Sequence, residues 1–330
     1  MSIDTELQAM RTHISNSYNA VQSKGGTIPQ TQSFANLSTA IDSIAIMNPN
    51  NGVSRYKLTN NGTTITPNDI PVTGLFNGAI KISGRYSENG TLKYGFTHTS
   101  MSGALVFPEL TDINCSYGFD NAFAYTNITS ATFSKLNFNY YGGSYFFSYA
   151  FAHCPYLTSV SFPEVTRIRS GTTFNYFCRD CVNLVSVDFS KLSEITGINN
   201  FFHAFDGCTS LTAISFPKLT IIDTNSSGNF SYAFAGCTSL SSVGFPLLDT
   251  INSANVFLYA FQNCTALTSI SFPKLSTIPA NVDPFSYYAF YGCTNLTEIH
   301  FKASIASTIQ NLAGYSTKFG ASNATIYFDL

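Results

Sequence analysis

The segment AFAGCTSLSSVGFPLL, residues 233–248, decides the fold of this chain because close copies of it recur along the sequence. Aligned copies place one cysteine each in a single column, at separations of 27, 27, 29, 27 and 29 residues. That column consists of Cys154, Cys181, Cys208, Cys237, Cys264 and Cys293. Repetition with a period of about 20 to 50 residues is typical of solenoids, in which each unit covers its apolar face with the next copy.

The same alignment produces a leucine column and a phenylalanine column. The leucine column is Leu157, Leu184, Leu211, Leu240, Leu267 and Leu296, with Ile128 as an earlier, degenerate member. The phenylalanine column is Phe133, Phe162, Phe189, Phe216, Phe245, Phe272 and Phe301. A further half-repeat, FPEL, lies upstream at residues 107–110. We expect both columns to form ladders in the core, because stacked strands lie about 4.8 Å apart.

The apolar pattern changes within each unit. Residues 230–237 carry Phe, Ala, Phe and Cys at i, i+3, i+4 and i+7, which predicts one face of a short helix. Residues 240–245 follow as L-x-x-V-x-F, which predicts a short strand with its apolar side chains inward. We therefore predict a repeat solenoid of the α/β leucine-rich-repeat type, with a short helix and a short strand in each unit of 27 to 29 residues.

The recurring string resembles a known family. AFAGCTSLSSVGFPLL and AFYGCTNLTEIHF are similar to the BspA-type leucine-rich repeats, whose hallmark is A-F-x-x-C-x-x-L-x-x-I. The likeness covers residues 105–305. The chain departs from the family in two ways, because the family's usual repeat is shorter and its strand runs into Pro-Ser-Ser where this chain has FPKL. The resemblance implies a leucine-rich-repeat fold and, as one option, a cell-surface adhesin.

One C-x-x-C motif, Cys178 and Cys181, raises the possibility of a redox or zinc pair. In the alignment, however, Cys181 is the ordinary column cysteine. Phe177-Cys178 stands where the other units have Ala-Phe, so a large residue and a small residue have exchanged places. Such an exchange conserves the filled volume. We therefore interpret the motif as a packing swap.

Composition and motifs argue against catalysis and against nucleic-acid binding. Only 10% of the residues are charged and the net charge is -2, so the chain lacks a basic nucleic-acid footprint. Phosphate-loop, dinucleotide, H-E-x-x-H and EF-hand strings do not occur. Because these strings are missing, we predict no enzyme, no catalytic residue and no cofactor. We also predict no metal site, because the histidines are scattered at positions 13, 98, 153, 203 and 300.

Residues 1–48 are predicted to form a helical segment for attachment and oligomerisation. An apolar stripe close to a heptad pattern predicts a helix and an oligomer interface, formed by Leu7, Met10, Ile14 and Val21. A second helix follows after Gly25-Gly26, and two helices of this size bury little alone. The expected partners are copies of the chain, with a trimer as one candidate, and another structural protein. VQSKGGTIPQTQSFANLSTAIDSI, residues 21–44, resembles N-terminal segments of phage and prophage tail-associated proteins.

The rest of the chain divides into three parts. Turn signals between short alternating runs predict a β-hairpin connector and N-terminal cap over residues 49–104. The solenoid is expected over 105–305 and a C-terminal cap over 306–330, because both ends of a solenoid core must be covered. The chain shows no apolar signal-peptide region and no stretch that could span a membrane, so we expect synthesis in a cytoplasm.

Tyrosines supply the candidate ligand-binding residues. Tyr140, Tyr141 and Tyr145 lie outside the inward-facing pattern, beside glycines, and tyrosine contacts saccharides or proteins with little loss of side-chain entropy. The alternative is that they cover the edge of the phenylalanine ladder. A second set precedes the repeat alanine and is interpreted as a structural stripe: Tyr149, Tyr176, Tyr232, Tyr259 and Tyr288.

Three functional classes follow. The leading hypothesis is a non-enzymatic phage or prophage tail fibre or receptor-binding component, located in the virion, whose solenoid contacts a cell-surface glycan or protein. The alternative is a BspA-type adhesin on the surface of a bacterium or protist. An enzyme supported by a solenoid is disfavoured, because no insertion between repeats is large enough to hold a catalytic domain.

Overall fold

The computed structural model describes most of the repeat region and short pieces before it. The described residues are 58–60, 63–65, 80–83, 102–107, 110, 113–114, 117–138, 144–169, 171–223, 228–286 and 288–330. The predicted oligomer interface (Leu7, Met10, Ile14 and Val21) and two candidate ligand-binding residues, Tyr140 and Tyr141, lie outside these ranges.

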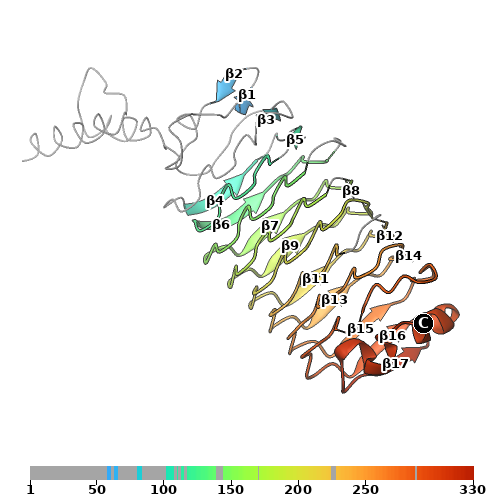
Figure 1. Cartoon of the computed structure of the whole chain (residues 1–330). Helices are drawn as coiled ribbons and strands as arrows, with labels where there is room; N and C mark the ends of the chain where they lie inside the picture. The colour runs from blue at the N-terminus through green and yellow to red at the C-terminus, as the bar shows by residue number, and fades with distance from the viewer. Residues whose placement is uncertain are drawn as a thin grey trace, which may run out of the picture.

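The predicted repeat solenoid is confirmed, and its strands lie side by side along the molecule (Figure 1). Each unit contributes one strand to the first row because its L-x-x-V-x-F segment alternates inward and outward. The strands of this row are β4 (Ser102–Val106), β6 (Asn127–Thr132), β7 (Ser159–Ser161), β9 (Ser186–Asp188), β11 (Ala213–Ser215), β13 (Ser242–Gly244), β15 (Ser269–Phe272), β16 (Glu298–Phe301) and β17 (Thr325–Phe328).

Parallel pairing joins equivalent residues of successive units. Ile214 lies opposite Val243, 29 residues later, and Phe272 lies opposite Phe301. The pairing divides the row into three groups, namely β4-β6-β7-β9, β11-β13 and β15-β16-β17. Side chains that point inward in one unit therefore rest on the same side chains of the next unit.

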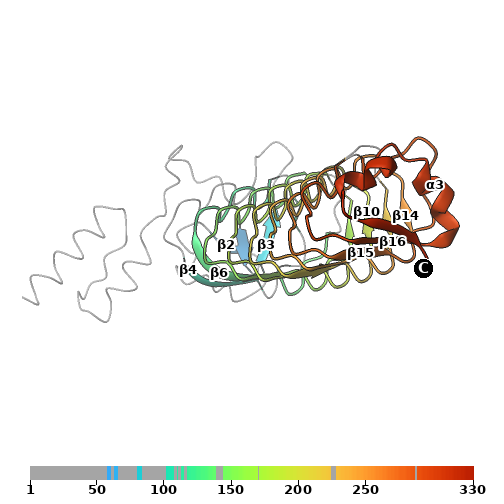
Figure 2. The ribbon, with the colours of Figure 1, turned by 90° about the horizontal axis from the view of Figure 1, so that it is seen from below.

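A second row of two-residue strands forms another side of the solenoid (Figure 2). Its hydrogen-bonded strands run parallel in the order β14-β12-β10-β8, with an isolated bridge from Thr250 to Thr277 beyond β14. Their bounds are β8 (Arg167–Ile168), β10 (Glu194–Ile195), β12 (Ile221–Ile222) and β14 (Thr250–Ile251). This row belongs to the segment that returns the chain to the start of the next unit.

The third side differs in detail from the predicted short helix, because residues 230–237 form successive turns. The amide of Ala233 donates within the unit to the Phe230 carbonyl at 3.0 Å, whereas the amide of Tyr232 donates to Leu258 of the next unit at 2.9 Å. Tyr232 has a left-handed φ of 54°, which interrupts a helix. The alternating amides thus find hydrogen-bond partners both within a unit and in the next unit. We call the side of the solenoid formed by residues 230–237 and their equivalents in the other units the turn side.

The core consists of the predicted columns. The rings of Phe107 and Phe133 stack at 4.8 Å, and the same column continues to Phe301. The centroid distance widens to 6.0 Å between Phe189 and Phe216, where β9 and β11 are not hydrogen-bonded to each other. The described cysteines and leucines of the repeat are buried in the same core.

Short elements lie near the two ends of the strand row. β1 pairs antiparallel with β2 and β3, which all precede the row in the chain, and β3 pairs parallel with β5, which lies between β4 and β6 in the chain. After β16, two 3-10 helices and one α-helix precede β17, and Phe319 packs against Phe285 at 5.1 Å. The bounds are β1 (Leu58–Asn60), β2 (Thr63–Ile65), β3 (Ile80–Ser83), β5 (Ile113–Asn114), η2 (Ala303–Ile305), α3 (Ala306–Gln310) and η3 (Tyr315–Gly320).

Candidate recognition surface

The C-x-x-C motif lies in the core and is not a chemical site. Cys178 and Cys181 are both fully buried, and neither forms a disulfide. Burial raises the pKa of Cys178 to about 11 and raises the pKa of Cys181 well above its ordinary value. Since the thiolate is the nucleophile and the metal ligand, these thiols are held in their unreactive form.

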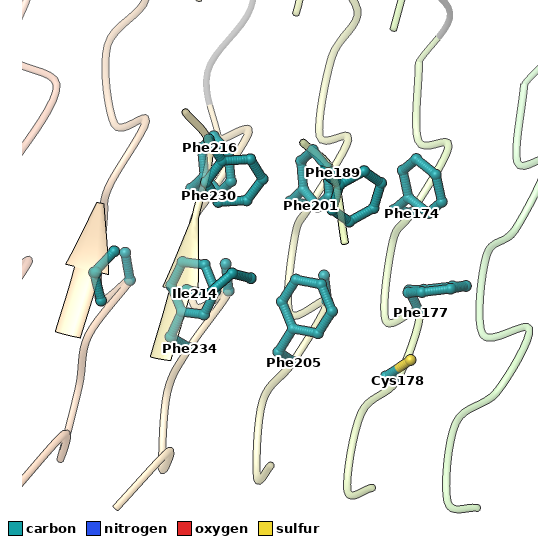
Figure 3. Close-up of a cluster of buried hydrophobic side chains, with 14 of the residues drawn as sticks. Phe174, Phe177, Cys178, Phe189, Phe201, Phe205, Ile214, Phe216, Phe230 and Phe234 are labelled. Atoms are coloured by element: carbon teal, nitrogen blue, oxygen red, sulfur yellow. The ribbon is translucent and has the colours of Figure 1, made fainter. Parts of the chain in front are cut away.

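The packing swap predicted from the sequence is visible in the rings (Figure 3). At the position of Cys178 the neighbouring units place Phe151 and Phe205. The ring of Phe177 fills the gap and lies edge-on to both, at 5.3 Å from Phe151 and 6.4 Å from Phe205. One large and one small residue have therefore exchanged places with the core still filled.

A row of half-exposed aromatic rings runs along the turn side. Tyr149 stacks on Tyr176 at 4.5 Å, and His203 continues the row between Tyr176 and Tyr232. Tyr232, Tyr259 and Tyr288 follow at 4.9 Å spacings. We call this the aromatic row: Tyr149, Tyr176, His203, Tyr232, Tyr259 and Tyr288. The stacked faces contact each other, so the rings expose their edges and not their faces to a ligand.

The backbone of the aromatic row is in a conformation that favours smaller residues. The φ angles of Tyr149, Tyr176, His203, Tyr232 and Tyr259 lie between 51° and 54°. Four residues later, the same left-handed conformation is occupied by Gly207, Gly236 and Gly292 in three units. The other three units place His153, Asp180 and Asn263 in this second left-handed column. The second column therefore varies between glycine and polar residues, whereas the first keeps aromatic residues.

Of the three candidate ligand-binding tyrosines, the structure describes Tyr145. It is 36% exposed and stacks on Tyr117 at 5.0 Å, with an interplanar angle of 5°. Tyr145 lies four residues before Tyr149 of the aromatic row, whereas Tyr117 lies four residues before Asn121 in the preceding unit. Tyr145 is therefore one ring of a second, shorter stack on the turn side.

An ionic network lies beside the aromatic row. Arg179 Nε is 3.5 Å from Asp180 Oδ2 and 3.5 Å from Asp206 Oδ2. His153 Nδ1 is 3.4 Å from Asp180 Oδ2, and His203 Nδ1 is 2.8 Å from Asp206 Oδ2. The network joins three successive units.

Sequence reasoning missed this network. His153 and His203 were counted among the scattered histidines, yet His203 lies 27 residues after Tyr176 and so belongs to the tyrosine column. This 27-residue spacing could have placed His203 in the aromatic row from the sequence alone. The network also needs Arg179, Asp180 and Asp206, whose convergence depends on how the turns are oriented.

Other charged residues in and near the second strand row pair with each other. Lys191 Nζ lies 2.6 Å from Glu164 Oε1, and Glu194 contacts Arg167 at 3.1 Å and Arg169 at 3.5 Å. Across the described part of the chain, no group of three or more His, Cys, Asp or Glu side chains is arranged to hold a metal ion. These carboxylates therefore act as partners of surface cations.

The fold and these columns define a leucine-rich-repeat solenoid. The family model described as "BspA type Leucine rich repeat region (6 copies)" matches residues 93–201, 119–231 and 172–319. These matches span more than half of the sequence, so the chain belongs to the BspA-type leucine-rich repeat family. They begin after residues 1–48, so the resemblance of that segment to tail-associated phage proteins stays a prediction.

Two solved structures are similar to this chain. A leucine-rich repeat protein from Bacteroides ovatus shares 20% identity, with a TM-score of 0.40, over 75% of this chain and 47% of that protein. A leucine rich cell surface protein from Faecalibacterium prausnitzii shares 15% identity, with a TM-score of 0.22, over 76% of this chain and 90% of that protein. The chain therefore spans about half of the Bacteroides protein. It has no match among curated proteins.

Proposed function

We propose that the chain is a non-catalytic recognition module of the adhesin type, which works at a cell surface and binds its ligand through the turn side. Membership in a family of repeat proteins supports this role. A search of the described helices finds none that is both long and apolar enough to cross a membrane. The proposal therefore concerns what the solenoid binds and leaves its means of attachment aside.

The observation that carries the proposal is the aromatic row. A tyrosine with φ near 52°, as at Tyr259, occupies a region that disfavours residues with a Cβ by about 1 to 2 kcal/mol. Glycine or asparagine would adopt it more easily, and the chain uses Gly236 and Asn263 in the adjacent column. Retention of aromatic rings in six successive units favours a use for the outward edges as a continuous binding strip.

The chemistry of the strip suits a polar surface ligand. Burial and the neighbouring Tyr176 raise the pKa of Tyr149, and burial and Tyr259 raise that of Tyr232. Tyrosine phenols are protonated at neutral pH even at their ordinary pKa, and these shifts act in the same direction, so both can donate hydrogen bonds. Rings with a polar tip provide apolar contact and hydrogen bonding together.

Binding of the purified chain to immobilised cell-surface glycans and extracellular matrix proteins tests this role. Wild-type protein should bind at least one of them saturably, and Tyr259→Asn should weaken binding, because asparagine tolerates the left-handed backbone but removes a ring from the strip. Leu247→Lys, on an exposed residue outside the strip, is the control. Equal binding by wild type and Tyr259→Asn would contradict the proposal.

Antibody labelling of intact cells tests the location. We expect labelling of the cell surface by antibodies against the solenoid. The tail-associated role, whose support is the residue 21–44 resemblance, instead requires that the chain copurify with virions and leave cells unlabelled. Tyr140, Tyr141 and Tyr145 remain proposed ligand contacts, and the N-terminal interface residues remain a proposed oligomerisation site.

A further inference from the structure

The repeat shows which exposed residues the stack itself requires. Position 1 after the column cysteine is threonine in four units, at Thr209, Thr238, Thr265 and Thr294. Position 4 after the cysteine is threonine or serine in every unit but one, at Thr158, Thr212, Ser241, Thr268 and Thr297. The stack therefore forms with a small polar residue at both positions. Packing within the stack does not account for a large apolar residue at either of them.

Large apolar side chains occupy these outward positions in two adjacent units. Val182 and Val185 replace the threonines and are 42% and 50% exposed. Tyr156 stands where later units carry serine, alanine or asparagine, and it is 57% exposed. Adjacent exposed apolar residues are typical of protein contact surfaces.

Hydrogen bonds hold these two units side by side. Asn183 Nδ2 donates to the Pro155 carbonyl at 2.7 Å, and the Val185 amide donates to the Thr158 carbonyl at 2.9 Å. Tyr156 occupies the same repeat position, one unit earlier, as Asn183, which follows Val182 in the chain. The three apolar residues therefore lie at one corner of the solenoid.

Charges of both signs flank this corner. Arg179 and Asp180 precede the inward-facing Cys181, and Val182 follows it. The side chains of Arg179 and Asp180 are 40% and 42% exposed, and they contact each other at 3.5 Å. We call the corner patch the set Tyr156, Arg179, Asp180, Val182 and Val185. It combines an apolar centre with a charged rim, the common anatomy of a protein interface.

We propose that the corner patch binds the corner patch of a second copy of this chain, forming a two-fold dimer. A two-fold contact pairs a surface with itself, so the surface must be its own complement. The patch meets that condition, because a two-fold rotation can place Arg179 of each copy opposite Asp180 of the other. A partner of a single charge sign would leave either Arg179 or Asp180 facing a like charge.

Aliphatic side chains also favour a protein partner over a saccharide. Val182 and Val185 offer no hydrogen bond to a hydroxylated ring, whereas they are well suited to pack against Tyr156 and the valines of another copy. The corner patch shares no residue with the aromatic row, but the two surfaces adjoin, because Arg179 Cζ lies 5.6 Å from the ring centroid of Tyr176. The substitutions Tyr156→Ser, Val182→Thr and Val185→Thr leave Arg179 and the aromatic row unchanged, so they separate failure of the dimer from failure of the ligand strip.

Sedimentation velocity of the full chain over about 1 to 300 µM tests the dimer, since small specific interfaces dissociate in this range. Wild type should convert from monomer to dimer as concentration rises. The variant Tyr156→Ser, Val182→Thr, Val185→Thr restores residues that other units carry, so it should fold and its dissociation constant should rise at least about tenfold. Circular dichroism and urea unfolding verify that the variant folds.

Two further variants sharpen the test. Leu247→Lys returns another exposed apolar residue to the lysine of neighbouring units and should dimerise as wild type does. Arg179→Asp introduces the residue that Asp206 places at the same position one unit later, and it should weaken the dimer by removing the charge pairing. A wild type that is monomeric throughout, or an assembly that persists unchanged in the triple variant, overturns the proposal.

Discussion

Cys208 donates its Sγ hydrogen to the carbonyl oxygen of Cys178, at a sulfur–oxygen distance of 3.1 Å. In the following unit the equivalent bond runs from Cys237 to the carbonyl of Phe205, also at 3.1 Å. The backbone of Cys178 therefore occupies the position that a phenylalanine backbone occupies elsewhere. The C-x-x-C motif combines this substituted position with the ordinary column cysteine, Cys181.

Restoring phenylalanine at position 178 should destabilise the protein. Cys178→Phe adds a ring to a space that Phe177 already fills, and overpacking of a core costs about 1 to 3 kcal/mol. Adding Phe177→Ala recreates the Ala-Phe pair of the other units, and most of the lost free energy of unfolding should return. Urea denaturation of the two variants measures the difference. A double variant no more stable than the single would show that the units are not equivalent here.

The thiols of the repeat should be inert in the folded protein. All seven described cysteines are free and buried, and burial raises the pKa of Cys178 to about 11. In a Cys115→Ser background, which removes the cysteine outside the described residues, a chromogenic disulfide reagent should react only after urea is added. Rapid reaction at Cys178 without denaturant would indicate an accessible thiolate and contradict the packing interpretation.

Two glycines separate backbone strain from steric overlap. A Cβ on Gly236, where φ is 70°, would lie at ordinary contact distance, so Gly236→Ala should cost about 1 to 2 kcal/mol for the left-handed backbone alone. A Cβ on Gly292 would overlap Asn263 Oδ1, so Gly292→Ala should cost more. In an Asn263→Gly background the overlap is absent. Thermal or urea unfolding should then give Gly292→Ala a loss similar to that of Gly236→Ala.

The last strand should respond to pH through His300. A hydrogen bond to Asp329 raises the pKa of His300, opposed by partial burial and assisted by Glu298. Because the folded pKa exceeds the unfolded pKa, protonated His300 stabilises the fold. This contribution is full below about pH 6.5, the ordinary value, and is lost as pH rises through the higher folded pKa. The difference in urea midpoint between wild type and His300→Gln should therefore shrink from acidic to alkaline pH. A difference that grows would reverse the assignment.

Sequence periodicity was sufficient to predict the core. The residues of the cysteine, leucine and phenylalanine columns are buried as expected, since each unit places the same side chain at the same level. The exchange at Phe177 and Cys178 could also be predicted, because it required only an alignment of the chain with itself. Repeats make packing predictable in this way because the neighbour of each residue is its own copy.

The turn side was harder to predict from sequence. The spacing of Phe230, Ala233, Phe234 and Cys237 suits a helix, and all four residues are indeed buried. The left-handed backbone at Tyr232 is hidden by its residue type, because tyrosine gives no signal for positive φ. The nearby residues that indicate a turn are Gly228 and Gly236. Residues 230–237 contain only one of them, Gly236, and a single glycine in eight residues is compatible with a helix. The ionic network depends on this turn geometry and so could not be predicted either.

The phenylalanine column also explains how such a chain can change in length during evolution. Every interior unit presents to the next one the ring that it receives from the previous one, as Phe216 does between Phe189 and Phe245. Duplication or deletion of one whole unit therefore leaves a phenylalanine against a phenylalanine at every remaining junction of this column, provided that the two ends are kept. Each duplication would lengthen the solenoid by about 4.8 Å. The length of the solenoid can thus change by whole units during evolution without a change in how its core packs.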